Sequence, residues 1–131
     1  MPSIFSRIVA GEIPCYKVAE TAEHLAFLDV NPNAVGHVLC IPKAESDKLF
    51  HLEPAAYQAL MAFAYNVAQA VEKAIPCKRV GMAVVGLEVP HVHVHLIPLQ
   101  HMDDFRFVQK VQLTPETFEA TAAAIAAAMA S

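Results

Sequence analysis

The segment between Pro90 and Pro98 constrains the fold of this chain most strongly, because histidine alternates there with aliphatic residues. A period of two predicts a β-strand, in which successive side chains point to opposite faces of a sheet. The histidine-bearing face comprises His91, His93, His95 and Ile97, and the opposite face comprises Val92, Val94 and Leu96. Neighbouring imidazoles on one face stand about 6–7 Å apart. Proline cannot donate to a strand ladder, so the two prolines set the predicted ends of the strand.

The remaining sequence places this strand in a series of strands and helices. Strands are predicted at residues 15–19, 24–30, 37–41, 79–85 and 91–98 from their alternation and flanking turn residues. Helices are predicted at residues 4–10, from Pro54 to about residue 75, and from Pro115 onward with Thr114 as N-cap. This order, with its short links, predicts an α+β fold with a mostly antiparallel sheet. Because no repeat or linker interrupts the chain, residues 1–131 are interpreted as one domain.

The composition narrows the classes of function. Hydrophobic residues make up 56% of the 131 residues and charged residues only 17%, which excludes a disordered chain and indicates that another subunit covers part of the surface. The formal net charge of −4 argues against the basic surface that binding to a nucleic-acid polymer requires. No apolar run reaches the roughly 18 residues of a membrane span, and the first residues do not resemble a secretion signal. Three scattered cysteines without a Cys-x-x-Cys pair predict a reducing, cytoplasmic location.

The histidine strand has three physical interpretations. In the first, the strand is half-exposed and its histidines have no function. In the second, it is a metal site, because histidines that alternate along a strand are good zinc ligands. The third interpretation is an anion or phosphoryl site, in which imidazoles act as nucleophile, hydrogen-bond donors and proton carriers near neutral pH. Three histidines in strict alternation with aliphatic residues disfavour the first interpretation. The triplet alone does not decide between the other two.

The pattern His-φ-His-φ-His-φ-φ, with φ apolar, resembles the signature of the histidine triad (HIT) family of nucleotide-binding proteins. Further matched segments include Ile4-Phe5, residues 26–30, Gly36-His37 and Ile41-Pro42-Lys43, so the resemblance covers nearly the whole chain and weakens after Pro98. It is closest to the small dimeric branch that hydrolyses nucleoside phosphoramidates and related nucleotide conjugates. The resemblance implies an antiparallel sheet of about five strands with one long helix, a short N-terminal helix and a C-terminal helix. It also implies a homodimer in which the long helix and the strand at 79–85 pair across a two-fold axis.

The resemblance implies covalent catalysis without a cofactor or a metal. The middle histidine, His93, would attack the α-phosphorus and form a nucleotidyl-histidine intermediate, which water then hydrolyses to a nucleoside monophosphate. The backbone carbonyl of His91 would accept the other ring proton of His93 and so fix its tautomer. His37 and His95 would donate to the phosphate oxygens and pass a proton to the leaving group.

The same resemblance implies a site for a purine nucleotide or nucleotide conjugate. Asp29 would accept from the ribose hydroxyls, although its position before Asn31-Pro32 also suits a turn residue. The apolar base pocket would be formed by Phe5, Ile8, Phe27 and Val30. For each of these four residues, an ordinary core position is an equally good interpretation.

The loop before the triad departs from the family pattern. Relatives commonly have Gly-Gln-Ser where this chain has Gly86-Leu87-Glu88, which replaces polar phosphate contacts with an aliphatic and an acidic side chain. A charged Glu88 would repel a phosphate, but it could also hold a proton, orient a histidine, select a cationic leaving group or point to solvent. This departure motivates an alternative function, a nucleotide-binding or interaction module with weak or lost catalysis.

The N-terminal segment also departs from the family. Some bacterial relatives hold a structural zinc with a Cys-x-x-Cys and histidines, whereas this chain has Ser3 and Ser6 at those positions, and Glu45 where relatives often have histidine. Without thiolates we predict no structural zinc. His24, His51 and His101 are interpreted as surface residues. Arg106 and Lys110 lie after the triad, in a region that varies among family members and often shapes the leaving-group side, but neither is named as a site residue.

Overall fold

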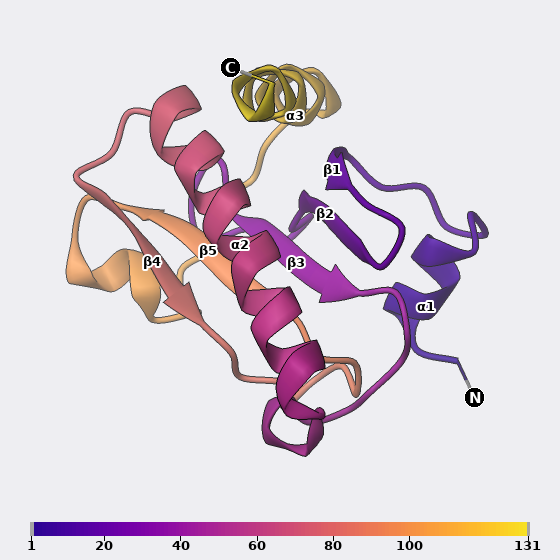
Figure 1. The fold of residues 1–131 in the computed structure, drawn as a ribbon. Helices are drawn as coiled ribbons and strands as arrows, with labels where there is room; N and C mark the ends of the chain where they lie inside the picture. The colour runs from indigo at the N-terminus through magenta and orange to yellow at the C-terminus, as the bar shows by residue number, and fades with distance from the viewer. Residues whose placement is uncertain (1, 131) are drawn as a thin grey trace.

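The computed structural model describes residues 2–130 and contains one antiparallel sheet (Figure 1). The strands are β1 (Lys17–Glu20), β2 (His24–Leu28), β3 (Val38–Pro42), β4 (Arg79–Ala83) and β5 (Val94–Leu99). Their spatial order is β1-β2-β3-β5-β4, so β1 and β4 form the edges. The predicted α+β class with a five-stranded antiparallel sheet is therefore confirmed.

The helices begin where the capping residues predict. They are α1 (Ile4–Val9), α2 (Pro54–Ala74) and α3 (Pro115–Met129), with short 3-10 turns η1 (Leu49–His51) and η2 (Met102–Phe105). The side chain of Thr114 accepts from the Thr117 backbone N–H at 3.1 Å, which satisfies a donor at the start of α3 that has no partner inside the helix. Among the described helices, none is long and apolar enough to cross a membrane.

The two faces of the sheet are covered by different elements. Helix α2 crosses one face and α3 packs beside it (Figure 1). These helices bury Leu60, Val67 and Ile125 against side chains of that face. On the other face a smaller apolar cluster joins Phe5 of α1 to Leu25, Phe27, Leu39 and Ile41. Since Leu39 pairs with His95 in the ladder between β3 and β5, the histidine side of β5 shares this second face.

The histidine strand begins later than predicted. The sequence predicts a strand from residue 91, but β5 starts at Val94, which pairs with Cys40 of β3. Before Val94 the backbone leaves the ladder because the Val92 N–H donates to the Ser46 carbonyl at 2.7 Å. His91 and His93 therefore lie on the segment that leads into β5 and not in the strand itself.

The turn into β3 requires glycine. Gly36 has φ +91°, and a Cβ at this position would lie 2.8 Å from Ile75 Cγ1 and 3.2 Å from Pro98 Cγ. Both the left-handed backbone and the close approach exclude other residues. The next residue, His37, has its N–H bonded to the Ala34 carbonyl at 3.2 Å, and its own carbonyl accepts from Asp29 N–H at 2.9 Å. The turn thereby holds His37 opposite Asp29.

One of the three histidines predicted to be at the surface is buried. His24 is only 8% exposed and stacks on Phe63 of α2 with ring centroids 5.1 Å apart, so the prediction for it is wrong. The reason is that His24 opens a strand with both faces covered, and an isolated histidine carries no sequence signal for this. His51 and His101 are exposed as predicted. The three cysteines are free, as their spacing predicts.

Candidate functional site

The histidine face of the sheet forms part of a cavity of about 500 Å³. Its walls come from the sheet side (Phe5, Asp29, Asn31, Leu39, His93, His95), from residues 85–89, and from the segment after β5 (Arg106, Phe107, Lys110). A cavity of this volume, lined by apolar side chains and a few convergent polar groups, is typical of a small-molecule site.

His93 presents an unprotonated ring nitrogen in this cavity. Its Nδ1 lies 2.7 Å from the backbone oxygen of His91, and a carbonyl can only accept, so Nδ1 carries the proton. In the neutral ring Nε2 then keeps its lone pair. Burial lowers the pKa of His93, and the negative charges of Asp29 and Glu88 oppose this effect without cancelling it. His93 is therefore a neutral imidazole near pH 7, suited to nucleophilic attack.

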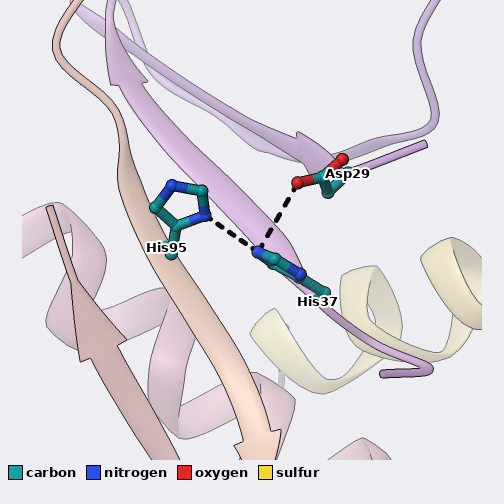
Figure 2. Close-up of side chains that lie close together, drawn as sticks. All are labelled: Asp29, His37 and His95. Atoms are coloured by element: carbon teal, nitrogen blue, oxygen red, sulfur yellow. Dashed lines mark hydrogen bonds and ion pairs between the residues drawn. The ribbon is translucent and has the colours of Figure 1, made fainter. Parts of the chain in front are cut away.

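His37 and His95 form a hydrogen-bonded pair whose tautomers can be assigned in the same way (Figure 2). The backbone N–H of Asn33 donates to His37 Nδ1 at 2.9 Å, so the neutral ring carries its proton on Nε2. That Nε2 donates to His95 Nδ1 at 2.9 Å. The proton of neutral His95 is therefore on Nε2, which makes His95 a donor at the cavity wall.

Burial keeps both rings of this pair neutral. It lowers the pKa of His37 to about 3, with smaller contributions from the charges of His95, Lys110 and His93. It also lowers the pKa of His95 to about 4, again with help from His93 and Lys110. Both imidazoles therefore donate and accept as neutral groups at physiological pH.

Asp29 supplies an acceptor next to this pair. It follows β2 directly, and its Oδ1 accepts from the Asn31 N–H at 2.8 Å in a local turn. Its Oδ2 lies 3.6 Å from His37 Nε2 (Figure 2). Desolvation raises the pKa of Asp29, and the Asn31 N–H and the Lys110 charge oppose the rise. Asp29 is therefore both a turn residue and a candidate site residue.

Asp29, His37 and His95 also bring three possible metal-ligand atoms within 4.8 Å of one another. The two ring nitrogens involved, His37 Nε2 and His95 Nδ1, are only 2.9 Å apart and share a hydrogen bond. With Asn33 N–H donating to His37 Nδ1, the neutral ring has no lone pair left on Nε2 for a metal. The cluster thus fits a proton-carrying pair better than a metal centre.

The segment after β5 brings three residues to the cavity that sequence reasoning missed. Phe107 lies edge-on to His95 with ring centroids 4.8 Å apart, and its φ is +62°. Lys110 Nζ donates to the Asn33 side-chain oxygen at 2.7 Å and lies 5.1 Å from the Phe107 ring centroid. Arg106 lines the cavity while pairing with Asp103 at 3.1 Å. This stretch has no periodic pattern, so the sequence gives no signal for its position.

Of the four residues predicted to form the base pocket, only Phe5 lines the cavity. Phe5 lines the cavity and meets His93 edge-on with ring centroids 5.0 Å apart. Phe27 and Ile8 pack in the apolar cluster behind it, and Val30 is 69% exposed and does not line the cavity. Glu88 is exposed but does line the cavity, and so does the 89%-exposed Leu87.

Comparison with known proteins identifies the architecture. The model of the HIT domain family matches residues 10–102. The chain belongs to the HIT family. The adenosine 5'-monophosphoramidase of Schizosaccharomyces pombe is 39% identical over 100 residues, covering 75% of this chain and 74% of that protein.

Solved HIT structures share the fold over almost the full chain. A Hit-like protein involved in cell-cycle regulation from Bartonella henselae, crystallised with an unknown ligand, has a TM-score of 0.84 at 30% identity over 96% of this chain and 95% of the other. A Zn-bound histidine triad family protein from Mycobacterium smegmatis has a TM-score of 0.83 at 26% identity, over 97% and 92% of the two chains. The predicted HIT-like arrangement of sheet and helices is therefore confirmed.

The residues of this HIT domain do not fit a structural zinc at the N-terminal position where some relatives hold one. Ser3, Ser6, Glu45 and His91 are joined there by hydrogen bonds. Zinc sites in proteins are built from thiolates, imidazoles and carboxylates, and two serine hydroxyls do not replace two thiolates.

Proposed function

We propose that this HIT protein hydrolyses nucleotide conjugates and releases a nucleoside monophosphate, with phosphoramidates as the substrate class. The observation that carries the proposal is the bond from His93 Nδ1–H to the His91 carbonyl, which leaves Nε2 of a neutral ring as a nucleophile at the cavity. Membership of the HIT family and the similarity to an adenosine 5'-monophosphoramidase support the same activity.

In the first step of the proposed reaction, His93 Nε2 attacks the α-phosphorus and the bond to the leaving nitrogen breaks. The leaving nitrogen enters the site protonated, so it departs as a neutral amine when its bond to phosphorus breaks, while His95 Nε2–H donates a hydrogen bond to a phosphate oxygen. The phosphorylated imidazole of His93 is cationic, because Nδ1 keeps its proton. The nearby carboxylates of Asp29 and Glu88, which favour the charged form of this ring, would stabilise that intermediate.

In the second step, water attacks the same phosphorus and releases a proton to solvent, and the bond from phosphorus to His93 breaks. The hydrogen bond from His37 Nε2 to His95 Nδ1 keeps His95 in the tautomer that each step needs. One water is consumed, and the nucleoside monophosphate and the amine are released. The mechanism requires no cofactor.

We further propose a purine ribonucleotide as the bound half of the substrate. Phe5, Leu39 and Val89 provide an apolar wall for a base, and Asp29 provides a carboxylate that accepts from ribose hydroxyls. Lys110 and Arg106 also line the cavity and supply positive charge for the phosphate. The loop at 86–88, a separate part of the lining, has no polar side chain suited to this contact.

The direct test is the release of AMP from adenosine 5'-phosphoramidate. We expect multiple turnovers by the wild-type protein, and we expect Asp29→Asn to reduce the preference for ribose over 2'-deoxyribose by about 10-fold, because the amide offers one acceptor oxygen instead of two. Rates measured with the two sugars give the preference directly. Asp47→Asn makes the same change at an exposed carboxylate that does not line the cavity, so it is the matched control and should keep the wild-type ratio. An unchanged ratio in Asp29→Asn would remove Asp29 from the ribose site.

A second candidate is a nucleotide-binding module without efficient catalysis, which the exposed Leu87 and Glu88 at the cavity favour. Tight AMP binding by calorimetry, with no turnover of phosphoramidates, adenylates or dinucleotides, would select it. Stoichiometric zinc in protein purified without a tag would instead select the metal-binding interpretation of the histidines.

We also propose a homodimer formed by α2 and β4. Strand β4 is an edge of the sheet, and Met82 on it is 46% exposed, while Tyr65 of α2 is 63% exposed. An uncovered edge strand beside exposed apolar side chains is suited to pairing with a second copy.

The dimer is tested by light scattering after gel filtration. We expect a mass of about twice 14.2 kDa for the wild type. Met82→Lys should shift it to the monomer mass, because it places a charge in the apolar contact. Val108→Lys, which charges a 75%-exposed position outside the proposed contact, should leave the dimer intact. A monomeric wild type at micromolar concentration would contradict the proposal.

A further inference from the structure

Four side chains next to the cavity form a hydrogen-bonded cluster that the proposed reaction does not use directly. Glu45 Oε1 accepts from the Ser3 backbone N–H at 2.7 Å and from the Ser6 hydroxyl at 2.6 Å. The Ser3 hydroxyl oxygen accepts from the Ser6 backbone N–H at 2.9 Å and lies 2.7 Å from His91 Nδ1. We call Ser3, Ser6, Glu45 and His91 the anchor cluster.

The direction of each hydrogen bond in the anchor cluster follows from the chemistry of its ends. His91 Nε2 lies 2.8 Å from the Pro42 carbonyl oxygen, which only accepts, so Nε2 carries the ring proton. His91 Nδ1 of the neutral ring is then an acceptor, and the Ser3 hydroxyl donates to it. The Ser6 hydroxyl donates to the Glu45 carboxylate. The Ser6 hydroxyl also lies 3.4 Å from His91 Nδ1, but its 2.6 Å contact makes the Glu45 carboxylate the stronger acceptor.

The anchor cluster fixes a ring that cannot exchange its partners with water. His91 is 0% exposed, so a rotation that broke its bonds to Ser3 and Pro42 would leave two buried ring nitrogens without partners. The segment that carries Glu45 holds the backbone as well, because the Ser46 carbonyl accepts from the Val92 N–H at 2.7 Å. His91 is thus held at two places: its ring bonds to Ser3 and Pro42, and the peptide group between His91 and Val92 bonds to Ser46.

That carbonyl is the group that sets the tautomer of His93, through the 2.7 Å bond from His93 Nδ1. We propose that Glu45, Ser3 and Ser6 are positioning residues that orient His91 and thereby keep His93 Nε2 unprotonated and aimed at the substrate. They orient His91 by hydrogen bonds alone, because the residues of the anchor cluster do not fit a zinc ion. The proposal rests on the proposed function for its kinetic consequence, but its structural consequence, the tautomer of His93, is independent of turnover.

The contacts make Glu45 the charged end of the cluster. The donors Ser3 N–H and Ser6 O–H hold the pKa of the Glu45 carboxyl below its usual range. A carboxylate accepts more strongly than a neutral oxygen, so it fixes both serines at the start of α1. Glutamine at this position keeps one acceptor oxygen of the same reach, whereas leucine removes the acceptor at similar size.

The experiment compares full-length variants by ¹⁵N NMR of the histidine rings and by turnover of adenosine 5'-phosphoramidate. In the wild type we expect His93 to show one tautomer with the proton on Nδ1. In Ser3→Ala and Glu45→Leu we expect the two tautomers to mix and kcat to fall about 10- to 100-fold, with KM changed less than about 2-fold. Ser3→Thr and Glu45→Gln, which keep the hydroxyl and the acceptor, should recover most of the rate and the single tautomer.

Ser46→Ala is the matched control, because it removes a hydroxyl from the same segment but keeps the carbonyl that holds Val92; both readouts should stay at wild type. The proposal is overturned if Ser3→Ala and Glu45→Leu keep the single tautomer, whether or not they lose activity. If the wild type turns over no conjugate, the proposed function fails and the tautomer measurement still decides the positioning role. Should Ser3→Ala unfold because α1 loses its N-cap, Glu45→Leu against Glu45→Gln decides the question alone.

Discussion

His93→Ala and His93→Asn are expected to lower the turnover of a nucleoside phosphoramidate by about 10⁴-fold or more, because both remove the nucleophile. Asparagine still offers an amide N–H to the His91 carbonyl and fills part of the space beside Phe5, so a shared loss in the two variants cannot come from an empty cavity. Acid-quenched single turnovers with label at the α-phosphorus measure the chemical step. The wild type should carry transient label on the protein, and the variants should carry none.

His51→Ala provides the control for this experiment. His51 is exposed on η1 and does not line the cavity, so its loss should leave both the rate and the label unchanged. The two His93 variants should still bind AMP, since the apolar wall and Asp29 remain. Turnover at the wild-type rate in either His93 variant would show that water attacks the substrate directly.

The free energy of unfolding is expected to fall by about 4 kcal/mol between pH 7 and pH 5. His37 and His95 have folded-state pKa values of about 3 and about 4, whereas the same side chains titrate near 6.5 when unfolded. The unfolded chain therefore binds protons in this window that the folded chain does not, and stability is lost as pH decreases. Each of the two histidines contributes about 2 kcal/mol. The lowered pKa values of His93 and His24 act in the same direction.

Urea denaturation followed by circular dichroism at several pH values measures this effect. The window stays above the usual range of carboxyl groups, so histidines dominate the proton uptake. His37→Gln should be less stable overall but should lose about 2 kcal/mol less between pH 7 and pH 5. His51→Gln should follow the wild type. A pH-independent wild type would show that the folded imidazoles take up protons as they do in the unfolded chain, and that burial does not lower their pKa values.

The sheet and its two faces could be predicted because the strands alternate. Leu25 and Phe27 fall on the site face while Ala26 and Leu28 fall on the helix face, as the period of two predicts. The start of β5 could not be predicted, since it depends on the bond between Val92 and Ser46, two residues far apart in sequence. The burial of His24 depends in the same way on the arrival of Phe63 from α2.

In the site, the sequence predicts the residues that lie on patterned segments and Glu88 on the loop before them, and misses those on the loop after β5. Asp29, His93 and His95 line the cavity, and His37 supports His95 from the turn after Gly36. Asn33 could not be predicted because its contribution to His37 is a backbone N–H, which nearly every residue type possesses. Ser3, Ser6 and Glu45 stand out in the sequence as departures from the family pattern, but their hydrogen bonds to one another and to His91 could not be predicted, because these residues are separated by up to 88 positions.

The separation of the reacting histidines from the loop walls of the cavity has an evolutionary consequence. The ring tautomers are fixed by bonds in the turn before β3, in the segment that leads into β5 and at His95 of β5, whereas residues 85–89 and 106–110 supply none of these bonds. Loops of this kind tolerate substitution, insertion and deletion better than strands do. Substitutions in residues 85–89 and 106–110 could therefore change the leaving-group preference in descendants of this chain, while the reaction itself stays the same. Libraries confined to these stretches would explore substrate range at little cost in folding.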